Sequence, residues 1–249
     1  MEFLKGKQAL VTGGGTGVGA AIALALAGAG AKVTISGRRQ APLDKVAAQS
    51  DLIETMTADV TNGSSISRLY EEIGPVDIVV ANAGAAESAP FGKVELAHWQ
   101  RMIDVNLTGV FLTLQGALPG MLERDYGRMI SVASTAGLKG YPYVAPYCAA
   151  KHGVVGLTKA LALETAKTGI TVNALCPGFV DTPLLEQSVQ NIVEKTGRSA
   201  DEARKMLAAN NPQGRLISPT EIAETLLWLC CDSSVAITGQ AISISGGEI

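Results

Sequence analysis

Short apolar runs alternate with longer segments of helical periodicity along most of the chain. The apolar runs are rich in aliphatic residues, which is typical of strands that are buried on both faces. Strands are expected at 8–11, 32–36, 53–58, 76–81, 128–133, 171–176 and 241–245. Helices are expected at 20–29, 42–49, 64–73, 98–123, 149–167 and 220–231. This alternation predicts an α/β fold: a doubly wound, seven-stranded parallel sheet with helices on both faces.

The segment 183–213 departs from the alternation, because it is polar and helix-prone and lies between the sixth and seventh strands. Its composition also fits an ordinary surface excursion. No linker or internal repeat divides the rest of the chain. We therefore expect residues 1–249 to form a single domain with an insertion at about 183–213.

Composition narrows the classes of partner. Hydrophobic residues make up 47% of the chain and aromatic residues only 4%, which fits a sheet of aliphatic strands covered by helices. The net charge of −3 gives no reason to expect a nucleic acid or an anionic membrane. The first residues run straight into the first strand, and no apolar run approaches the roughly 20 residues that span a bilayer. The cysteines lack metal or disulfide spacing, and two isolated histidines argue against a metal site. A cytoplasmic protein is expected.

A glycine-rich turn joins the first strand to the first helix. The sequence from 12 to 19 is Thr-Gly-Gly-Gly-Thr-Gly-Val-Gly. Gly13 suits the tight turn, Gly17 lets the backbone approach phosphates, and Gly19 lets the helix pack closely on the strand. This order delivers a pyrophosphate to a helix amino terminus and predicts a Rossmann-type dinucleotide site that includes Gly15, Thr16 and Val18. A glycine-rich hairpin or linker is the alternative.

Tyr147 and Lys151 lie four residues apart on a predicted helix, with Ser134 upstream. This spacing places both side chains on one helix face. Free tyrosine has a pKa of about 10. A cation about 4 Å away supplies on the order of 4 kcal/mol at an effective dielectric of about 20, enough to bring that pKa to roughly 7. The pair is thus predicted to be a proton donor and acceptor at neutral pH. Most such pairs taken alone are solvated helix faces.

With these motifs in place, the chain resembles the short-chain dehydrogenase/reductase family over nearly all of its length. The matching segments are, in chain order, 12–19, Asp59-Val60, Asn82-Ala83-Gly84, Asn106, Ser134, Tyr147 with Lys151, and Pro177-Gly178 followed by Thr182. Each segment alone is common, and the set in this order is specific. In similar proteins the segment 183–213 is a mobile lid over the substrate.

The resemblance implies a catalytic set of four residues. Ser134 would hydrogen-bond to a substrate carbonyl, and Tyr147 would act as general acid in reduction or base in oxidation. Lys151 would lower the pKa of the tyrosine and hold the nicotinamide ribose. Asn106 would anchor a water that reprotonates the site through the lysine. An asparagine inside a helix can instead satisfy a local backbone carbonyl.

The residues at the end of the second strand indicate whether NAD(H) or NADP(H) is the cofactor. Gly37 stands where an acidic residue would hold the adenosine ribose of NAD, and Arg38 and Arg39 follow it. Two guanidinium groups without a carboxylate suit a 2′-phosphate and favour NADP(H) over NAD(H). The arginines can also be ordinary surface residues. Thr16 stands where many NADPH-using relatives carry a basic residue, which makes the preference less absolute.

The resemblance assigns the rest of the cofactor site to the ends of later strands. Those residues are Asp59, Val60, Asn82, Ala83, Gly84, Pro177, Gly178, Val180 and Thr182. The first two would frame the adenine, and the residues from Pro177 onward would border the nicotinamide. For Asn82, a role in tying neighbouring strands together is an equal alternative.

The expected substrate pocket is mostly apolar. Its walls are expected at 85–87, 137–143, 179–180 and 184–185, without an obvious anchor for a small charged acid. An acyl chain fits such walls better than a sugar would. The segments around Tyr147 and 169–180 resemble those of bacterial polyketide ketoreductases and 3-oxoacyl reductases. The implied substrate is a ketone or alcohol, such as a 3-oxoacyl thioester of coenzyme A or of an acyl carrier protein.

Other readings of the same residues stay open. Arg128 matches one basic position of relatives that dock a carrier protein, but Thr168 stands at the second. The end of the insertion, at 210–212, looks like that of 3-hydroxybutyrate dehydrogenases, so a 3-hydroxyacid or secondary alcohol dehydrogenase is the alternative enzyme. A cofactor-binding sensor without catalysis is the non-enzymatic alternative. The resemblance also implies a homotetramer, and the apolar run 226–231 indicates either a subunit contact or a fully buried helix.

Overall fold

A computed structural model describes residues 2–249 and contains one seven-stranded sheet. Every neighbouring pair of strands is parallel, and the strand order is β3-β2-β1-β4-β5-β6-β7. The strands are β1 (Gln8–Thr12), β2 (Lys32–Gly37), β3 (Ile53–Thr57), β4 (Ile78–Ala81), β5 (Gly127–Val132), β6 (Ile170–Pro177) and β7 (Ala241–Ile244). The predicted single-domain, doubly wound Rossmann fold is confirmed, and each strand end lies within two residues of its expected position.

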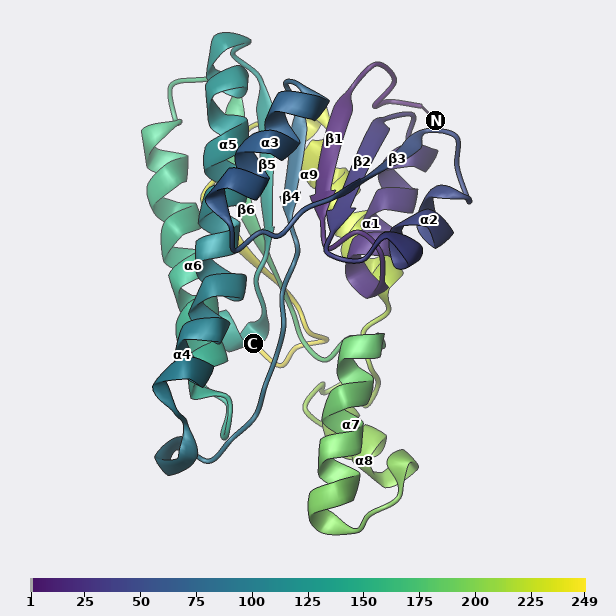
Figure 1. Cartoon of the computed structure of the whole chain (residues 1–249), viewed down its shortest axis with the longest axis vertical. Coiled ribbons are helices and arrows are strands. Elements are labelled where there is room, and N and C mark those ends of the chain that lie inside the picture. The colour runs from purple at the N-terminus through teal and green to yellow at the C-terminus, as the bar shows by residue number, and fades with distance from the viewer. Residues whose placement is uncertain (1) are drawn as a thin grey trace.

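Nine α-helices are present among residues 2–249, and most of them cover the two faces of the sheet, whereas α7 and α8 lie beyond its end (Figure 1). The helices are α1 (Gly17–Gly28), α2 (Gln40–Ala47), α3 (Gly63–Ile73), α4 (Leu96–Ile103), α5 (Gly109–Glu123), α6 (Ala145–Glu164), α7 (Pro183–Thr196), α8 (Ala200–Ala208) and α9 (Pro219–Cys230). The helix with Tyr147 begins at Ala145, earlier than the expected 149, because Pro146 occupies its first turn, where a proline costs no hydrogen bond.

Two hydrophobic cores lie on the opposite faces of the sheet. Side chains alternate between them along a strand: Val11 of β1 packs with α1, α2 and α9, whereas Leu10 packs with α3, α5 and α6. Both side chains are fully buried. Because both faces are covered, the strands are apolar at nearly every position, which is the pattern that identified them in the sequence.

The chain between α4 and α5 forms a π-helical turn, Asp104–Thr108, that the sequence did not predict. The N–H of Gly109 donates to the carbonyl of Asp104, five residues back. The side-chain amide of Asn106 donates to the carbonyl of Met102 at 3.0 Å. Single π-turns of this kind occur frequently at functional sites. The expected helix at 98–123 is therefore continuous in direction but widened at Asn106.

The continuous helical stretch Leu96–Glu123 is long and apolar enough to cross a membrane by length and composition alone, with a window of mean hydropathy 1.3. The sequence-based expectation concerned an uninterrupted apolar run, whereas this test averages hydropathy over a window that admits charged residues. Core helices of soluble proteins meet the same test. Val110, Leu114, Ala117 and Met121 of α5 belong to the core on the sheet, which accounts for its apolar face.

The helices α7 and α8 form a lobe that projects beyond the carboxyl end of the sheet (Figure 1). They pack on each other around a small apolar cluster of their own, with Leu185, Val189 and Ala203 buried. The polar segment expected at 183–213 is therefore two helices and their connections. Its role as a lid stays a prediction.

Candidate active site

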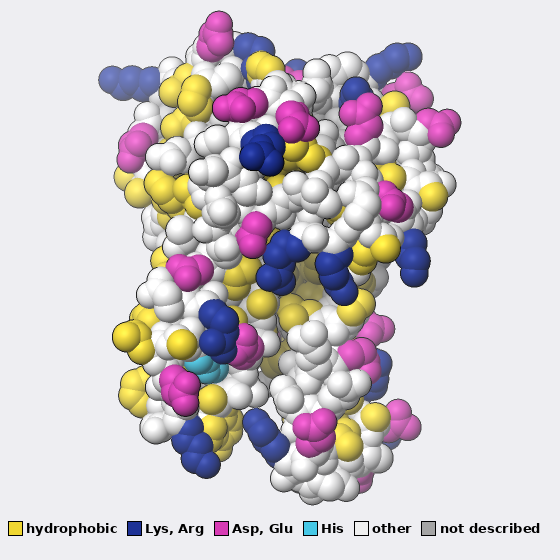
Figure 2. All heavy atoms as spheres, in the orientation of Figure 1, with side chains coloured by type: hydrophobic (Ala, Val, Ile, Leu, Met, Phe, Trp, Pro, Cys, Tyr) yellow, Lys and Arg dark blue, Asp and Glu magenta, His cyan; other side chains and the backbone are white. Residues whose placement is uncertain are grey.

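A cleft of about 1650 Å³ opens at the carboxyl ends of the strands. In Figure 2 this face is hollowed between the body of the protein and the α7–α8 lobe, with lysine and arginine side chains on the rim. Ligands of open α/β sheets bind at this end, beside the point where the strand order reverses. Here that point lies between β1 and β4. The structure brings every predicted catalytic and cofactor residue into the lining of this one cleft.

The glycine turn has no room for side chains at its critical positions. Gly13 has φ +67°, and a β-carbon there would lie 2.8 Å from the Cα of Ala83. A β-carbon on Gly19 would collide with the carbonyl of Gly13, so α1 packs directly on the turn. Gly17 also has positive φ, +54°, and faces Thr182. The turn brings bare backbone to the cleft, which is what close approach of a pyrophosphate requires.

The amino end of α1 supplies unpaired backbone donors at the same place. Thr16 is the N-cap residue, and its side chain makes no capping hydrogen bond. The first turn of α1 contains no acidic side chain. The first N–H groups of the helix therefore keep their capacity and their partial positive charge for an anion in the cleft. The residues present fit a dinucleotide.

The adenosine end of the cleft is lined by Gly37, Arg38, Arg39 and Asp59. Both arginines are exposed, and Arg39 is the N-cap residue of α2. Hydrogen bonds from the backbone and hydroxyl of Thr61, with a smaller contribution from the charge of Arg38, hold the pKa of Asp59 below its usual value. The charge of Arg38 thus acts on the Asp59 carboxylate. No carboxylate stands at position 37 to compete with a 2′-phosphate.

Tyr147 lies in the first turn of α6 and faces Ser134, which follows β5. Burial raises the pKa of Tyr147 to about 12, against a smaller lowering by the nearby Ser134 side chain. The Ser134 hydroxyl oxygen accepts from the backbone N–H of Ala136 at 3.1 Å, and the hydroxyl donates a long bond, 3.5 Å, to the carbonyl of Pro177. The sequence-based expectation of a tyrosine pKa near 7 is wrong for the protein without ligands, because desolvation outweighs any effect of the lysine.

Lys151 is one turn further along α6 and is 3% exposed. Its ammonium lies 5.6 Å from the centre of the Tyr147 ring and donates to the carbonyl of Val132 at 2.8 Å. Burial lowers the pKa of Lys151 to about 8. Desolvation therefore moves both groups toward their neutral forms. The lysine is positioned beside the tyrosine ring, as its spacing predicted.

Asn106 is fully buried in the π-turn. Its amide donates to the carbonyls of Ala85 and Met102, and its oxygen accepts from the N–H of Ala85. A β-carbon on Gly84 would lie 2.9 Å from the Asn106 side-chain oxygen and 3.8 Å from the Lys151 ammonium nitrogen. Asn106 therefore fixes the strand-end loop at Ala85 beside the lysine. Both of its N–H donors go to backbone, as the alternative interpretation requires, and its part in proton relay stays a prediction.

Asn82 and Thr182 have structural partners in addition to facing the cleft. The Asn82 amide donates to the carbonyls of Thr12, at 2.9 Å, and Gly13, at 3.3 Å. It ties the end of β4 to the glycine turn, which is the strand-tying alternative raised from the sequence. Thr182 is the N-cap residue of α7 and accepts from Leu185. Their contacts with a cofactor stay predictions.

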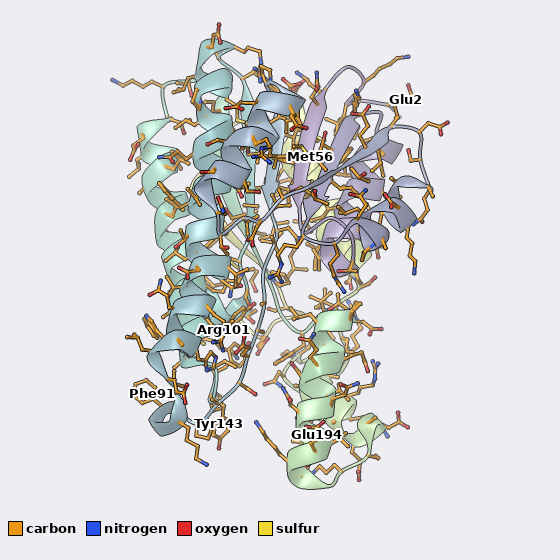
Figure 3. All side chains as sticks on the ribbon, viewed as in Figure 1. Glu2, Met56, Phe91, Arg101, Tyr143 and Glu194 are labelled. Atoms are coloured by element: carbon orange, nitrogen blue, oxygen red, sulfur yellow. The ribbon has the colours of Figure 1, made fainter. Side chains whose placement is uncertain are left out.

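The substrate end of the cleft lies between the β4–α4 connection and α7. Figure 3 shows Phe91, Arg101 and Tyr143 along one side of the gap and Glu194 of α7 on the other. The expected walls at 85–87, 179–180 and 184–185 line the cleft, and of 137–143 only 141–143 do so. Sequence reasoning found only the start of α7 and of the β4–α4 connection, and it missed the residues further along both segments, for which only helical periodicity gave a signal. The added lining residues are Ser88, Ala89, Pro90, Lys93, Gln187, Ser188, Asn191, Ile192 and Lys195.

Arg128 cannot serve as a docking residue for a carrier protein. It is only 2% exposed, and its guanidinium donates to the carbonyls of Gly127 and Gly169. It also lies 3.9 Å from Asp232 and stacks on the ring of Tyr126. The apparent match arose because a buried structural arginine occupies the start of β5.

The lowered pKa of Lys151 predicts a pH dependence of stability. The folded pKa of about 8 lies below the ordinary 10.5, so the unfolded chain binds more protons between these values. Stability should therefore rise with pH across this window, by about 3 kcal/mol, and level off above it. Urea unfolding between pH 7 and 10 checks this prediction: the difference in the free energy of unfolding between the wild type and Lys151→Met should change with pH. Lys159→Met, at an exposed position of the same helix, is the control, and a pH-independent difference for Lys151→Met would contradict the assignment.

Comparisons with known proteins agree with this geometry. A family model described as short chain dehydrogenase matches residues 7–192. A putative ketoacyl reductase of Streptomyces coelicolor is 42% identical over 184 residues, which cover 73% of this chain and 70% of that protein. D-beta-hydroxybutyrate dehydrogenase of Cupriavidus necator is 38% identical, with 99% of both chains covered. Acetoacetyl-CoA reductase of Rhizobium meliloti is 38% identical, with 96% and 97% covered.

Among solved structures, a variant of actinorhodin polyketide ketoreductase with NADPH matches this fold with a TM-score of 0.93. The two chains are 38% identical, and the match covers 97% of each. The sequence match, the strand order and the arrangement of the cleft thus agree, and the chain belongs to the short-chain dehydrogenase family.

Proposed function

We propose that this chain is an NADPH-dependent ketoreductase that converts the ketone of a 3-oxoacyl thioester, or of a similar substrate, to a secondary alcohol. The observation that carries the proposal is the single cleft, which joins the phosphate-binding turn, the arginine pair and the Ser134–Tyr147–Lys151 group. The names of the ketoacyl and acetoacetyl-CoA reductases among its relatives support it, as does the NADPH in the similar solved structure.

The cofactor would lie along the strand ends with its pyrophosphate on the turn before α1 and its 2′-phosphate between Arg38 and Arg39. Arginine grips a phosphate with paired hydrogen bonds, and the missing carboxylate at position 37 removes the repulsion that would disfavour this charge. Bound NADPH supplies the hydride. Asp59 and Val60 would border the adenine, and Pro177, Gly178, Val180 and Thr182 the nicotinamide.

The protein groups handle the proton and the position of the carbonyl. Because burial raises the pKa of Tyr147 to about 12, this phenol holds its proton at neutral pH and can donate it to the developing alkoxide. Ser134 directs its hydroxyl toward the same oxygen. Lys151, with its pKa lowered to about 8, exchanges protons near neutral pH and can resupply the tyrosine. A tyrosine that keeps its proton favours reduction over oxidation.

The substrate end suits an acyl chain that is linked to a larger group outside the cleft. Phe179, Leu184 and Leu185 give an apolar lining, and the lysines at 93 and 195 line the cleft as well. Coenzyme A and the phosphopantetheine of a carrier protein both carry phosphate that such cations attract. The alternative activity, oxidation of a 3-hydroxyacid or other secondary alcohol, is supported by the full-length match to D-beta-hydroxybutyrate dehydrogenase.

We further propose that the protein is a cytoplasmic homotetramer. The four cysteines are free thiols, which is typical of a reducing compartment. Large apolar side chains are exposed on the outer surfaces of α5, α6 and α9: Phe111 (41%), Leu122 (47%), Leu163 (80%) and Trp228 (47%). Such exposed side chains, on α5 and α6 at one face of the sheet and on α9 at the other, favour burial between copies of the chain.

Activity is the first test of the proposed function. Oxidation of NADPH, followed by its absorbance, should occur with acetoacetyl-CoA. Tyr147→Phe should lower kcat about 10²- to 10⁴-fold, because it removes the proton donor, and should leave NADPH binding in place. Tyr126→Phe, a tyrosine outside the cleft lining, is the control. Full activity of Tyr147→Phe would contradict the assigned role, and turnover of secondary alcohols alone would favour the dehydrogenase.

The cofactor assignment predicts a switch. Gly37→Asp combined with Arg38→Ala should weaken NADPH binding about tenfold or more and strengthen NADH binding, since the carboxylate can accept from ribose hydroxyls. Position 37 has room for a side chain, because a β-carbon there would meet only Leu43, at 3.8 Å. Fluorescence titration measures both dissociation constants. Arg68→Ala, on the exposed face of α3, is the control, and an unchanged NADPH-to-NADH ratio would exclude this 2′-phosphate site.

The oligomer prediction is independent of activity. Light scattering after gel filtration should give about four times the chain mass of 25.7 kDa. Leu163→Glu places a charge on the proposed contact face and should lower that mass. Leu52→Glu, at an exposed leucine before β3, should not. A monomeric wild type would refute the proposal.

A further inference from the structure

The side chain of Glu248, after the last strand, is almost completely buried. It is only 3% exposed, although it is the penultimate residue of the chain. The ammonium of Lys139 lies 2.8 Å from its Oε1, and the hydroxyl of Tyr141 donates to the same oxygen at 2.6 Å. A buried carboxylate is costly unless such partners satisfy it. In Figure 1 the C-terminal end lies below the sheet, at the end from which the α7–α8 lobe projects.

Tyr141 connects this carboxylate to the cleft. Its hydroxyl also lies 2.7 Å from the Thr135 hydroxyl, which must donate because the tyrosine proton is directed to Glu248. Burial, with a further contribution from the Glu248 bond, raises the pKa of Tyr141, so the phenol keeps this proton. Its ring packs edge-on against Phe179, at 5.9 Å between centroids, and both rings line the cleft. Thr135 is the neighbour of Ser134 in sequence.

Besides Glu248, the loop that carries Tyr141 is held by Thr135 and Phe179 at Tyr141 and by Leu138, which packs against the core. Residues 138–144 form no regular element between the short 3₁₀ turn η3 (Thr135–Gly137) and α6. Tyr143 has φ +68°, a conformation that residues with a β-carbon seldom adopt. The carbonyl of Tyr143 accepts from the N–H of Ala89, in the β4–α4 connection on the same side of the cleft. The two contacts with Glu248 therefore hold the middle of a loop whose end is strained.

Gly178 makes room for the carboxylate on its other side. A β-carbon on Gly178 would lie 3.3 Å from Oε2 of Glu248. Gly178 lines the cleft next to Phe179. Glu248 thus lies directly behind the wall that Tyr141, Gly178 and Phe179 form.

We propose that Glu248 is a positioning residue for the substrate end of the cleft. It fixes the hydroxyl of Tyr141, and through it the Tyr141–Phe179 wall against which the group beside the carbonyl packs. This inference rests on the proposed ketone substrate. It assigns the choice among ketones, by chain length and by the face presented to hydride, in part to a residue that touches neither substrate nor cofactor.

Two measurements on Glu248→Ala, Glu248→Gln and the matched control Ile249→Ala test the proposal. Ile249 is the next residue, is half-exposed and is absent from the cleft lining. The first measurement is hydrogen–deuterium exchange of the protein without substrate. Glu248→Ala should speed exchange in 138–144 about tenfold and leave the turn at 13–19 unchanged, because only the loop loses its support. Unchanged exchange in 138–144 would overturn the positioning role, whatever the enzyme's activity.

The second measurement compares NADPH reduction of 3-oxoacyl thioesters of increasing chain length. Glu248→Ala should raise KM for the ketone about tenfold, change the ratio of the two alcohol enantiomers, and leave the NADPH dissociation constant unchanged. Glu248→Gln keeps an oxygen acceptor for Tyr141 and should recover most of the enantiomer ratio. Tyr141→Phe should give the same ratio as Glu248→Ala, and the double variant no further change.

The outcomes separate this inference from the proposed function. A wild type that reduces no ketone refutes the proposed function, while faster exchange in 138–144 would still establish the positioning of the loop. Equal losses for every ketone, with the enantiomer ratio unchanged, would overturn the assignment of substrate choice to Glu248. Additive effects of Tyr141→Phe and Glu248→Ala would overturn the proposed route through Tyr141.

Discussion

The junction between β1 and β4 is the contact on which the site depends. Here the strand order reverses, and the Asn82 side chain bonds to the backbone of Thr12 and Gly13 across the gap. Gly13 and Gly19 let the turn, β4 and α1 approach to backbone contact. This packing aims the unpaired N–H groups of α1 into the cleft and sets the line along which the other strand ends contribute residues. A single side chain added at this junction would displace the elements that form the cofactor half of the cleft.

Burial sets the pKa values of Tyr147 and Lys151 in the substrate half of the cleft. Tyr147 and Lys151 are taken out of water together, so each moves toward its neutral form, and their pKa values shift in opposite directions. The tyrosine becomes a firmly protonated acid, and the lysine a group that exchanges protons close to neutral pH. The asymmetry that the proposed mechanism uses, a phenol that keeps its proton beside a lysine that exchanges one, thus comes from desolvation near the amino terminus of α6.

The sequence predicted the parts of the site that depend on local pattern. Strand ends, the glycine turn and the Tyr147–Lys151 spacing follow from periodicity and residue type, which tertiary contacts do not override here. The π-turn at Asn106 was not predicted, because the Asn106 amide bonds both to Met102 and to Ala85, which is 21 positions away in sequence and gives no local signal. The predicted pKa of Tyr147 was wrong for a similar reason. The spacing indicates that a cation would lower this pKa, but the opposing effect of burial depends on the whole fold.

Residues distant in sequence mark the limit of pattern-based inference. Arg128 matched a docking position and is instead buried against Tyr126 and Asp232. Glu248 lies 107 positions from Tyr141, and nothing in its local sequence signals their contact. Both contacts can be recognised only once the strand order is known. That order places the start of β5 next to Asp232, which follows α9, and places the C-terminus behind the cleft wall.

Transfer of deuterium tests the central claim most directly, because it follows the hydride across the cleft. NADPH that carries deuterium at the transferable position of its nicotinamide would be incubated with acetoacetyl-CoA, and the product analysed by mass spectrometry and NMR. The account predicts a 3-hydroxyacyl product with deuterium on the carbon that bears the new hydroxyl, in one enantiomer. A hydroxyl product without deuterium, or tight NADPH binding with no transfer to any ketone, would contradict it.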